Sequence, residues 1–127
     1  MMREQTRQFI EQFWQAMNTN DWSAASALLH EECVLEYPQS GERFRGREAF
    51  IALNGKYPVV GPWRFDVQRI IAEEREAVSA VTVTAPTITA LVVSFFEVRD
   101  STIWHITEYW PEAFDAPTWR AQWAEHQ

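Results

Sequence analysis

TIWHITEYWPE, residues 102–112, is the stretch from which the fold and the candidate site of this chain are inferred. Its β-branched and aromatic residues predict a strand, which ends at Pro111 because proline has no N–H to donate to a neighbouring strand. Side chains alternate between the two faces of a strand, so Glu108 is expected on the same face as Trp104 and Trp110. A carboxylate beside two indoles is either a desolvated acid or base in a pocket, or a group satisfied by a structural partner such as an arginine.

The rest of the chain alternates between helical and strand-like patterns, separated by residues that favour turns. In order, the pattern predicts two helices, a short strand, a polar loop, a third helix and four strands, over residues 3–17, 22–29, 33–37, 39–45, 46–53, 63–68, 77–85, 88–98 and 102–110. Pro117 lies near the start of a short terminal helix that carries Trp119 and Trp123.

This order of elements predicts the α+β class. Consecutive strands that follow one another through short turns pair as hairpins, which gives a curved, mainly antiparallel sheet. The helices are then expected to pack on one face of that sheet. A length of 127 residues is typical of one domain, so we expect a single domain over residues 1–127.

Charge and cysteine content exclude several classes of partner. The net charge of −7, without a cluster of lysines or arginines, argues against binding to nucleic acid or to an anionic membrane. No apolar run is long enough to span a bilayer. A lone cysteine, Cys33, excludes an internal disulfide, and residues 1–5 lack the apolar segment of a secretory signal, so a cytoplasmic location is expected.

Other chemistries have little support in the sequence. His30, His105 and His126 are far apart and lack an acid at ligand spacing, so no metal site is expected. No glycine-rich phosphate loop or nucleophile elbow is present, and no cofactor is expected. Glu36 and Arg47 are interpreted as a structural pair rather than as catalytic groups.

Five short segments of the chain form a recognisable set, namely the aromatic-rich first helix, Asn20-Asp21-Trp22, Glu36-Tyr37-Pro38, Gly46-Arg47-Glu48 and Glu108-Tyr109-Trp110. Together they resemble the nuclear transport factor 2-like superfamily, whose cone-shaped fold includes SnoaL-like polyketide cyclases, ketosteroid isomerases and limonene epoxide hydrolases. The resemblance spans essentially the whole chain. It implies helices on the concave face of the sheet, and it carries less information about chemistry, because unrelated activities share this scaffold.

The catalytic groups of two branches of this superfamily are only partly present. The resemblance places the base of the ketosteroid isomerases at Tyr37 and their second acid near Ser94, so neither acid is in place. Limonene epoxide hydrolases use an Arg-Xaa-Asp pair on a middle strand, and residues 78–83 contain no acid or arginine. Only their terminal acid has a counterpart, Glu108. The SnoaL-like cyclases resemble this chain more loosely, but they need chiefly one acid-base group and an apolar cavity, which Glu108 with Trp14, Trp63 and Trp104 could supply.

Two interpretations of function remain open. In the first, the chain is a cofactor-independent cyclase, isomerase or hydrolase, with Glu108 as general acid or base and Tyr37 as donor to a substrate oxygen. The apolar substrate would lie against a set of side chains expected to line the cavity, namely Trp14, Trp63, Ser94, Trp104 and Trp110. In the second, the same cavity binds an apolar ligand without turnover, or the fold acts as a dimerisation module.

The face of the sheet away from the helices also carries apolar side chains. It is expected to include Ile103, His105, Thr107 and Tyr109 of the last strand and one apolar set from residues 88–98. A large exposed apolar patch is rare on a soluble monomer. We therefore expect a homodimer through the sheet face, which the resemblance to the cone-fold superfamily also implies.

Overall fold

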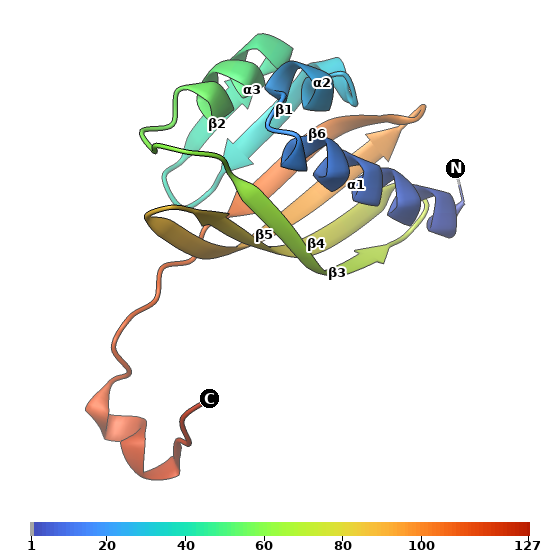
Figure 1. The fold of residues 1–127 in the computed structure, drawn as a ribbon. Coiled ribbons are helices and arrows are strands. Elements are labelled where there is room, and N and C mark those ends of the chain that lie inside the picture. Colours follow the sequence, from blue (N-terminus) through green and yellow to red (C-terminus); the bar gives the residue numbers. More distant parts are fainter. Residues whose placement is uncertain (1) are drawn as a thin grey trace.

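The computed structural model describes residues 2–127 (Figure 1). Its elements are α1 (Arg3–Asn18), α2 (Trp22–Ser26), β1 (Leu29–Tyr37), β2 (Glu42–Arg45), α3 (Gly46–Gly55), β3 (Arg64–Ala72), β4 (Glu76–Ala85), β5 (Ile88–Arg99), β6 (Thr102–Tyr109) and the 3₁₀ helix η1 (Thr118–Trp123). The predicted α+β class is confirmed. No helix within residues 2–127 combines the length and the apolar character needed to cross a membrane.

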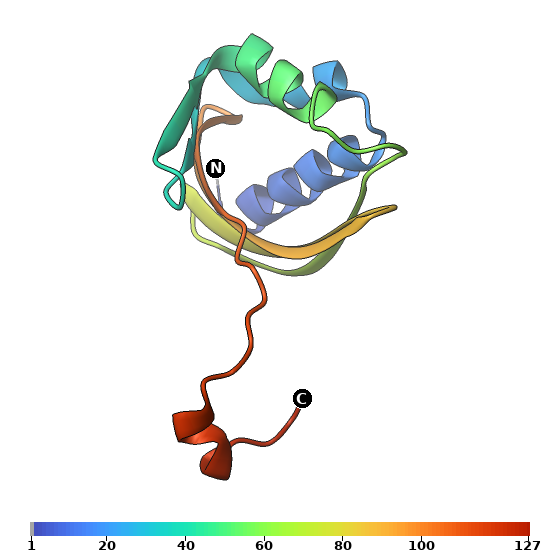
Figure 2. The ribbon, with the colours of Figure 1, turned by 90° about the vertical axis from the view of Figure 1, so that its left-hand side faces the viewer.

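The six strands form one sheet in the order β2-β1-β6-β5-β4-β3. Every neighbouring pair is antiparallel except β1 and β6, which are parallel. The sheet curls around α1, and α2 and α3 close the same side, so the three α-helices lie on its concave face (Figures 1 and 2). The expected curved, mainly antiparallel sheet with helices on the concave face is therefore confirmed.

The first helix supplies the centre of the core. Its apolar stripe, at positions three and four residues apart, turns Ile10, Phe13, Trp14 and Met17 toward the sheet, and all four are buried. Phe13 packs edge-on against Phe96 of β5, with ring centroids 5.6 Å apart. The predicted amphipathic helix over residues 3–17 is confirmed, with one further residue at its end.

Two boundaries near the N-terminus differ from prediction. The second helix ends at Ser26 rather than at residue 29, and β1 begins at Leu29 instead of Cys33. The loop predicted over residues 39–45 contains β2, which turns back at Gly41 and pairs with the end of β1. Gly41 has φ +79°, a backbone conformation that glycine adopts without strain, and this turn was not inferred from the polar sequence. The sheet accordingly has six strands rather than a set of four plus a separate short strand.

A bulge in β6 breaks the alternation expected for that strand. Glu97 pairs with His105 and Val98 with Ile103, so Trp104 is the extra residue. Ile103 therefore faces the core, fully buried, and the expectation that it lies on the outer face is wrong. His105, Thr107 and Tyr109 lie beyond the bulge on the convex face, which is the face expected for them.

The chain beyond β6 leaves the body of the molecule on the convex side of the sheet (Figures 1 and 2). We call residues 111–127 the C-terminal arm. The predicted terminal helix is present in this arm as η1, a single six-residue 3₁₀ helix. Its two tryptophans, Trp119 and Trp123, are exposed.

Candidate functional site

A cavity of about 1000 Å³ lies between the concave face of the sheet, the second half of α1 and helix α3. Most of its wall is apolar, with a few polar groups, as is typical of sites for small molecules. The wall includes Phe13, Trp14, Met17, Leu35, Tyr37, Leu53, Trp63, Val92, Ile106, Glu108 and Trp110. The cavity also reaches residues 39–42 and 111–113, where β1 and β6 end.

Glu108 is the acidic group inside this cavity, and both of its carboxylate oxygens accept hydrogen bonds. Ser94 Oγ, on the paired position of β5, donates to Oε2 at 2.9 Å. Trp110 Nε1 donates to Oε1 at 2.8 Å. The sequence left the partner of this carboxylate open among a hydroxyl, an indole N–H, an arginine and water, and the structure supplies the first two.

Burial in the apolar cavity raises the pKa of Glu108 above its ordinary value of 4.5. The hydrogen bonds from Trp110 and Ser94 favour the charged form and lower the pKa, but they offset only part of the burial effect. A carboxyl group tuned upward in this way holds its proton closer to neutral pH. It can therefore exchange a proton with a bound molecule as an acid or a base.

Tyr37 lies at the end of β1 and lines the same cavity. Burial raises the pKa of its phenol strongly, and the negative charge of Glu108 raises it further. The phenol therefore stays protonated and is a hydrogen-bond donor at neutral pH. Its ring packs edge-on against Phe44 of β2, with centroids 5.3 Å apart, so the missed strand β2 helps to fix its position.

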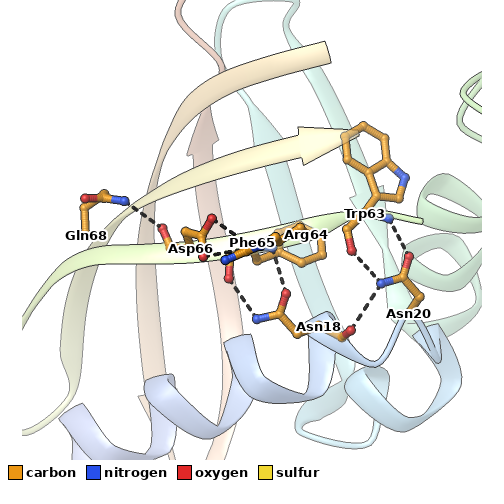
Figure 3. Close-up of polar contacts among 7 residues, drawn as sticks. All are labelled: Asn18, Asn20, Trp63, Arg64, Phe65, Asp66 and Gln68. Atoms are coloured by element: carbon orange, nitrogen blue, oxygen red, sulfur yellow. Dashed lines mark hydrogen bonds and ion pairs between the residues drawn. The ribbon is translucent and has the colours of Figure 1, made fainter. Parts of the chain in front are cut away.

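Trp63 is held in the cavity wall by two asparagines that follow one another closely at the end of α1 (Figure 3). Asn20 accepts from the backbone N–H of Trp63 at 2.7 Å and donates to its carbonyl at 2.8 Å. Asn18 makes the same pair of contacts with Phe65, at 2.7 and 2.8 Å. Because β3 is an edge strand, these side chains replace the missing backbone partner and fix the position at which Trp63 enters the cavity wall.

The Trp63 ring in turn contacts Trp110, with centroids 6.4 Å apart and the rings nearly perpendicular. Trp110 is the residue whose indole binds Glu108. Its backbone N–H donates to Gln39 Oε1 at 2.7 Å, which ties the end of β6 to the turn after β1. The position of Glu108 therefore depends on contacts that begin at the end of α1.

A row of polar side chains crosses three strands beneath the cavity. Ser79 of β4 is paired with Ser94 of β5, and Ser94 is paired with Glu108 of β6. Ser79 is fully buried and accepts a hydrogen bond from Trp14 Nε1 at 3.1 Å. Both ends of this row are thus bound by an indole N–H, from α1 and from the residue after β6.

The structure brings together most of the residues predicted to form the site. Glu108, Tyr37, Trp14, Trp63 and Trp110 line the cavity, and Ser94 lies directly behind the Glu108 carboxylate.

Trp104 does not belong to this group. As the bulged residue of β6 it lies outside the cavity wall, stacked on His30 with ring centroids 3.5 Å apart, and Arg99 lies 4.5 Å above its ring. The prediction that it lines the cavity is wrong because simple alternation does not extend through a bulge.

The predicted structural pair of Glu36 and Arg47 is also wrong, because each of these side chains binds another partner. Glu36 binds Arg43 of β2 at 3.0 Å and lies 3.6 Å from His105, whereas Arg47 donates to the carbonyl of Leu29 at 2.9 Å. These contacts brace the far side of β1 and do not reach the cavity. Among residues 2–127, no group of three or more His, Cys, Asp or Glu side chains is arranged to hold a metal ion.

Sequence reasoning missed Asn18, Asn20 and Ser79. Ser79 could have been found from the alternation of β4, because it lies on the same face as the buried Ala77, Val81 and Val83. A buried hydroxyl at such a position needs a hydrogen-bond partner. In the sequence, the two asparagines belong to a run of turn-forming residues after the first helix, and Asn20 also belongs to the family-like segment Asn20-Asp21-Trp22. Nothing in the sequence shows that their side chains bind a distant edge strand.

Comparison with known proteins identifies relatives over most of the chain. A family model described as a SnoaL-like domain matches residues 10–106. A protein from Kribbella flavida DSM 17836, named for a proposed ketosteroid isomerase activity, is 33% identical, with a TM-score of 0.90 over 98% of this chain and 91% of its own. An NTF-2 like protein of unknown function from Burkholderia xenovorans LB400 is 32% identical, with a TM-score of 0.80 over 100% of this chain and 99% of its own.

An LEH-like epoxide hydrolase from M. tuberculosis has the same fold. It is 23% identical, with a TM-score of 0.71 over 86% of this chain and 84% of its own. A search of curated proteins gave no match.

Proposed function

The chain belongs to the SnoaL-like domain family, and we propose that it is a cofactor-independent enzyme of the cyclase, isomerase or hydrolase type that acts on an apolar small molecule. The observation that carries this proposal is one carboxyl group, Glu108, set in an apolar cavity of about 1000 Å³ with its pKa raised by burial. A group that is only structural has no need of an open cavity beside it.

In this proposal Glu108 transfers the proton and Tyr37 donates a hydrogen bond to an oxygen of the substrate. Ser94 and Trp110 keep the carboxyl group oriented in both protonation states, because each can still donate when the carboxyl is neutral. The indoles of Trp14 and Trp63 provide flat apolar surfaces for the carbon skeleton.

The substrate is proposed to be a neutral molecule with a carbonyl or epoxide oxygen. Glu42 and Glu112 lie at the cavity together with Glu108, and no arginine or lysine lines it among the described residues. An anionic substrate would therefore meet like charges without a partner cation. Steroid-type isomerisation with two acids is not proposed, since Tyr37 and Ser94 stand where the resemblance places those acids.

Binding is tested with N-phenyl-1-naphthylamine, a neutral apolar probe whose fluorescence rises in a dry pocket, competed by panels of neutral cyclic ketones, lactones and epoxides. We expect micromolar binding that survives Glu108→Gln. Turnover of the competing compound should fall at least a hundredfold in that variant, because glutamine cannot transfer the proton. Glu36→Gln, which removes a carboxylate outside the cavity, should leave turnover unchanged.

Two outcomes would contradict the proposal that the chain is an enzyme. Equal turnover in Glu108→Gln and in the unaltered chain would remove Glu108 from the chemistry. Binding without turnover of any compound would favour the second function, a ligand-binding module with the same cavity.

We also propose that two copies pair through the convex face of the sheet. Ile71, Leu91, Phe95 and Tyr109 expose between 37 and 53% of their surface there. We call these four residues the convex patch. A standard interface buries roughly 800 Å² per partner, and an apolar sheet face of this kind is a suitable centre for one.

The remaining parts of the proposal concern location and other partners. The buried free thiol of Cys33, whose pKa is raised to about 12 by burial, is unreactive and suits the reducing cytoplasm. A net charge of −7 disfavours nucleic acid and anionic membranes as partners.

A further inference from the structure

The C-terminal arm carries large apolar side chains. Its first residues, 111–113, line the cavity, and the three aromatic side chains lie beyond them. Phe114, Trp119 and Trp123 are 77, 71 and 72% exposed. Within residues 2–127, no hydrogen bond or ion pair joins the arm to the body, and the hydrogen bond that it contains closes its own 3₁₀ helix, from Ala124 to Ala121. Figures 1 and 2 show the arm standing clear of both the sheet and the helices.

A six-residue 3₁₀ helix is too short to be stable alone, because its hydrogen bonds are few and poorly aligned. Aromatic side chains bury about 150–250 Å² each when they pack, so the three in the arm offer roughly 450–750 Å². An apolar surface of this size on one short segment indicates contact with another molecule.

The matches to two relatives extend through the arm. The match to the Kribbella flavida protein covers 98% of this chain and the match to the Burkholderia xenovorans protein covers all of it. At most a few residues are left outside these matches, so the arm has an aligned counterpart in both relatives. An exposed aromatic segment that makes no hydrogen bond to its own body, among residues 2–127, needs another surface to bury its side chains.

The direction in which the arm leaves the body indicates a second copy of the chain as its partner. The arm leaves on the convex side of the sheet, the side on which the convex patch is exposed (Figure 2). Residues 111–117 contain no helix or strand, and fully extended, at about 3.3 Å per residue, they can reach at most roughly 23 Å. Packed sheets lie only about 10 Å apart, so an arm of this length passes the facing sheet and arrives on the body of a copy paired through the convex face.

The charges of the arm also favour a protein as its partner. It contains Glu112, Asp115 and Glu125 against one arginine, Arg120. Tryptophans in a segment that binds an anionic membrane are normally accompanied by an excess of lysine and arginine. The arm therefore suits a protein surface rather than a lipid surface.

We propose that the C-terminal arm packs Phe114, Trp119 and Trp123 against a second copy of this chain, so that two copies exchange arms. This inference rests on the proposed pairing through the convex patch, and two-fold symmetry then makes each copy both give and receive an arm. The arm extends the interface beyond the sheet face and makes it specific for this chain.

The first test measures the dissociation constant of the dimer by sedimentation velocity for the full-length chain with Trp119→Ala and Trp123→Ala together. We expect the dissociation constant to rise at least tenfold. The matched control is Gln122→Ala with Glu125→Ala, in the same part of the arm, which should change the constant less than twofold. Far-ultraviolet circular dichroism checks that the body, which makes no hydrogen bond to the arm among the described residues, stays folded.

The second test places the photoreactive residue p-benzoylphenylalanine at position 123 of the full-length chain, mixed with ¹⁵N-labelled unaltered chain. Irradiation should give a covalent dimer with a light and a heavy chain, and mass spectrometry should locate the cross-link on the body of the heavy chain. Cross-links found only within one chain would overturn the proposal.

The outcomes separate the arm from the proposed pairing and from the cavity. A dimer that is unaffected by the two tryptophan substitutions but is broken by Phe95→Glu would overturn the exchange alone. A chain that is monomeric at all concentrations would overturn both the exchange and the pairing. Binding of N-phenyl-1-naphthylamine in the cavity reports separately on the proposed enzyme.

Discussion

Each face of the six-stranded sheet departs in one place from the chemistry expected of an isolated soluble domain. The concave face, which is covered by helices, contains the polar row of Ser79, Ser94 and Glu108 beside a cavity. The convex face, which is open to solvent, carries the apolar convex patch. A short polar row is thus buried within a largely apolar face, and an apolar patch is exposed on the opposite face.

This difference fits the two roles proposed for the sheet, ligand binding on the concave face and pairing on the convex face. On the concave face, polar atoms are retained at a cost because they orient Glu108 toward the space for a ligand. On the convex face, apolar side chains are left open to solvent, and the proposed pairing of two copies would cover them. One strand contributes to both faces: Phe96 and Phe95 are neighbours on β5, yet Phe96 is buried in the core and Phe95 is half exposed.

Substitution of these two neighbours gives the largest expected contrast. Phe96→Ala should lower the free energy of unfolding by about 3–5 kcal/mol, because it leaves a cavity among Phe13, Trp14 and the sheet. Phe95→Ala should cost less than about 1 kcal/mol in the monomer, because that ring is half in solvent. Urea unfolding at a concentration below the dimer dissociation constant measures both. Similar losses for the two variants would mean that the faces do not differ as described.

Phe95→Glu tests the convex face in the opposite way. The charge leaves the monomer intact but has to be buried twice in a symmetric dimer, so association should weaken about a hundredfold, equivalent to about 2.8 kcal/mol. Glu97→Gln, on the same strand, serves as the control for a change of charge. A dimer of unchanged affinity would place the interface elsewhere.

Asn20 tests how the cavity wall is held. Asn20→Ala should lower stability by about 1–2 kcal/mol, because it removes both hydrogen bonds to Trp63, and should also weaken probe binding. Asn20 has φ +59°, so Asn20→Gly is the matched variant that loses the side chain without backbone strain. The glycine variant should weaken probe binding as much as the alanine variant does. Full probe affinity in both would show that Trp63 needs no such support.

The smallest expected effect is the dependence of stability on pH. Burial raises the pKa of Glu108 in the folded chain, so between its ordinary value of 4.5 and the raised value the folded state binds the proton more tightly than the unfolded state. The contribution of the Glu108 proton to the stability of the fold is fully present below pH 4.5 and is lost as the pH rises through the raised pKa. The melting temperature of Glu108→Gln, relative to the unaltered chain, should therefore rise over this range and then level off. A difference that is constant with pH would contradict the burial of this carboxyl.

The sequence was sufficient for the fold and for most of the site because the signals were local. Helical spacing in residues 3–17 and alternation in residues 77–85 survive into the structure with small shifts at their ends. Glu108 was recognisable because an acid among indoles and aliphatic residues is unusual in a strand.

The remaining features depend on contacts between distant residues. The bulge that turns Trp104 away from the cavity is visible only in the register between β5 and β6. Strand β2 exists because residues 42–45 find the end of β1, although their own composition is polar. The exposure of the arm follows from its distance from the body rather than from its residues, which predicted only a helix.

The most direct measurement of the central claim, that Glu108 is a protonatable group in a ligand cavity, is a ¹³C NMR titration of the side-chain carboxyl groups in chain labelled at glutamate. The resonance that is absent in Glu108→Gln should titrate at a clearly higher pH than the other glutamates, and addition of N-phenyl-1-naphthylamine should raise its midpoint further by excluding water. A Glu108 resonance that titrates together with the exposed glutamates, and does not respond to the probe, would contradict the account.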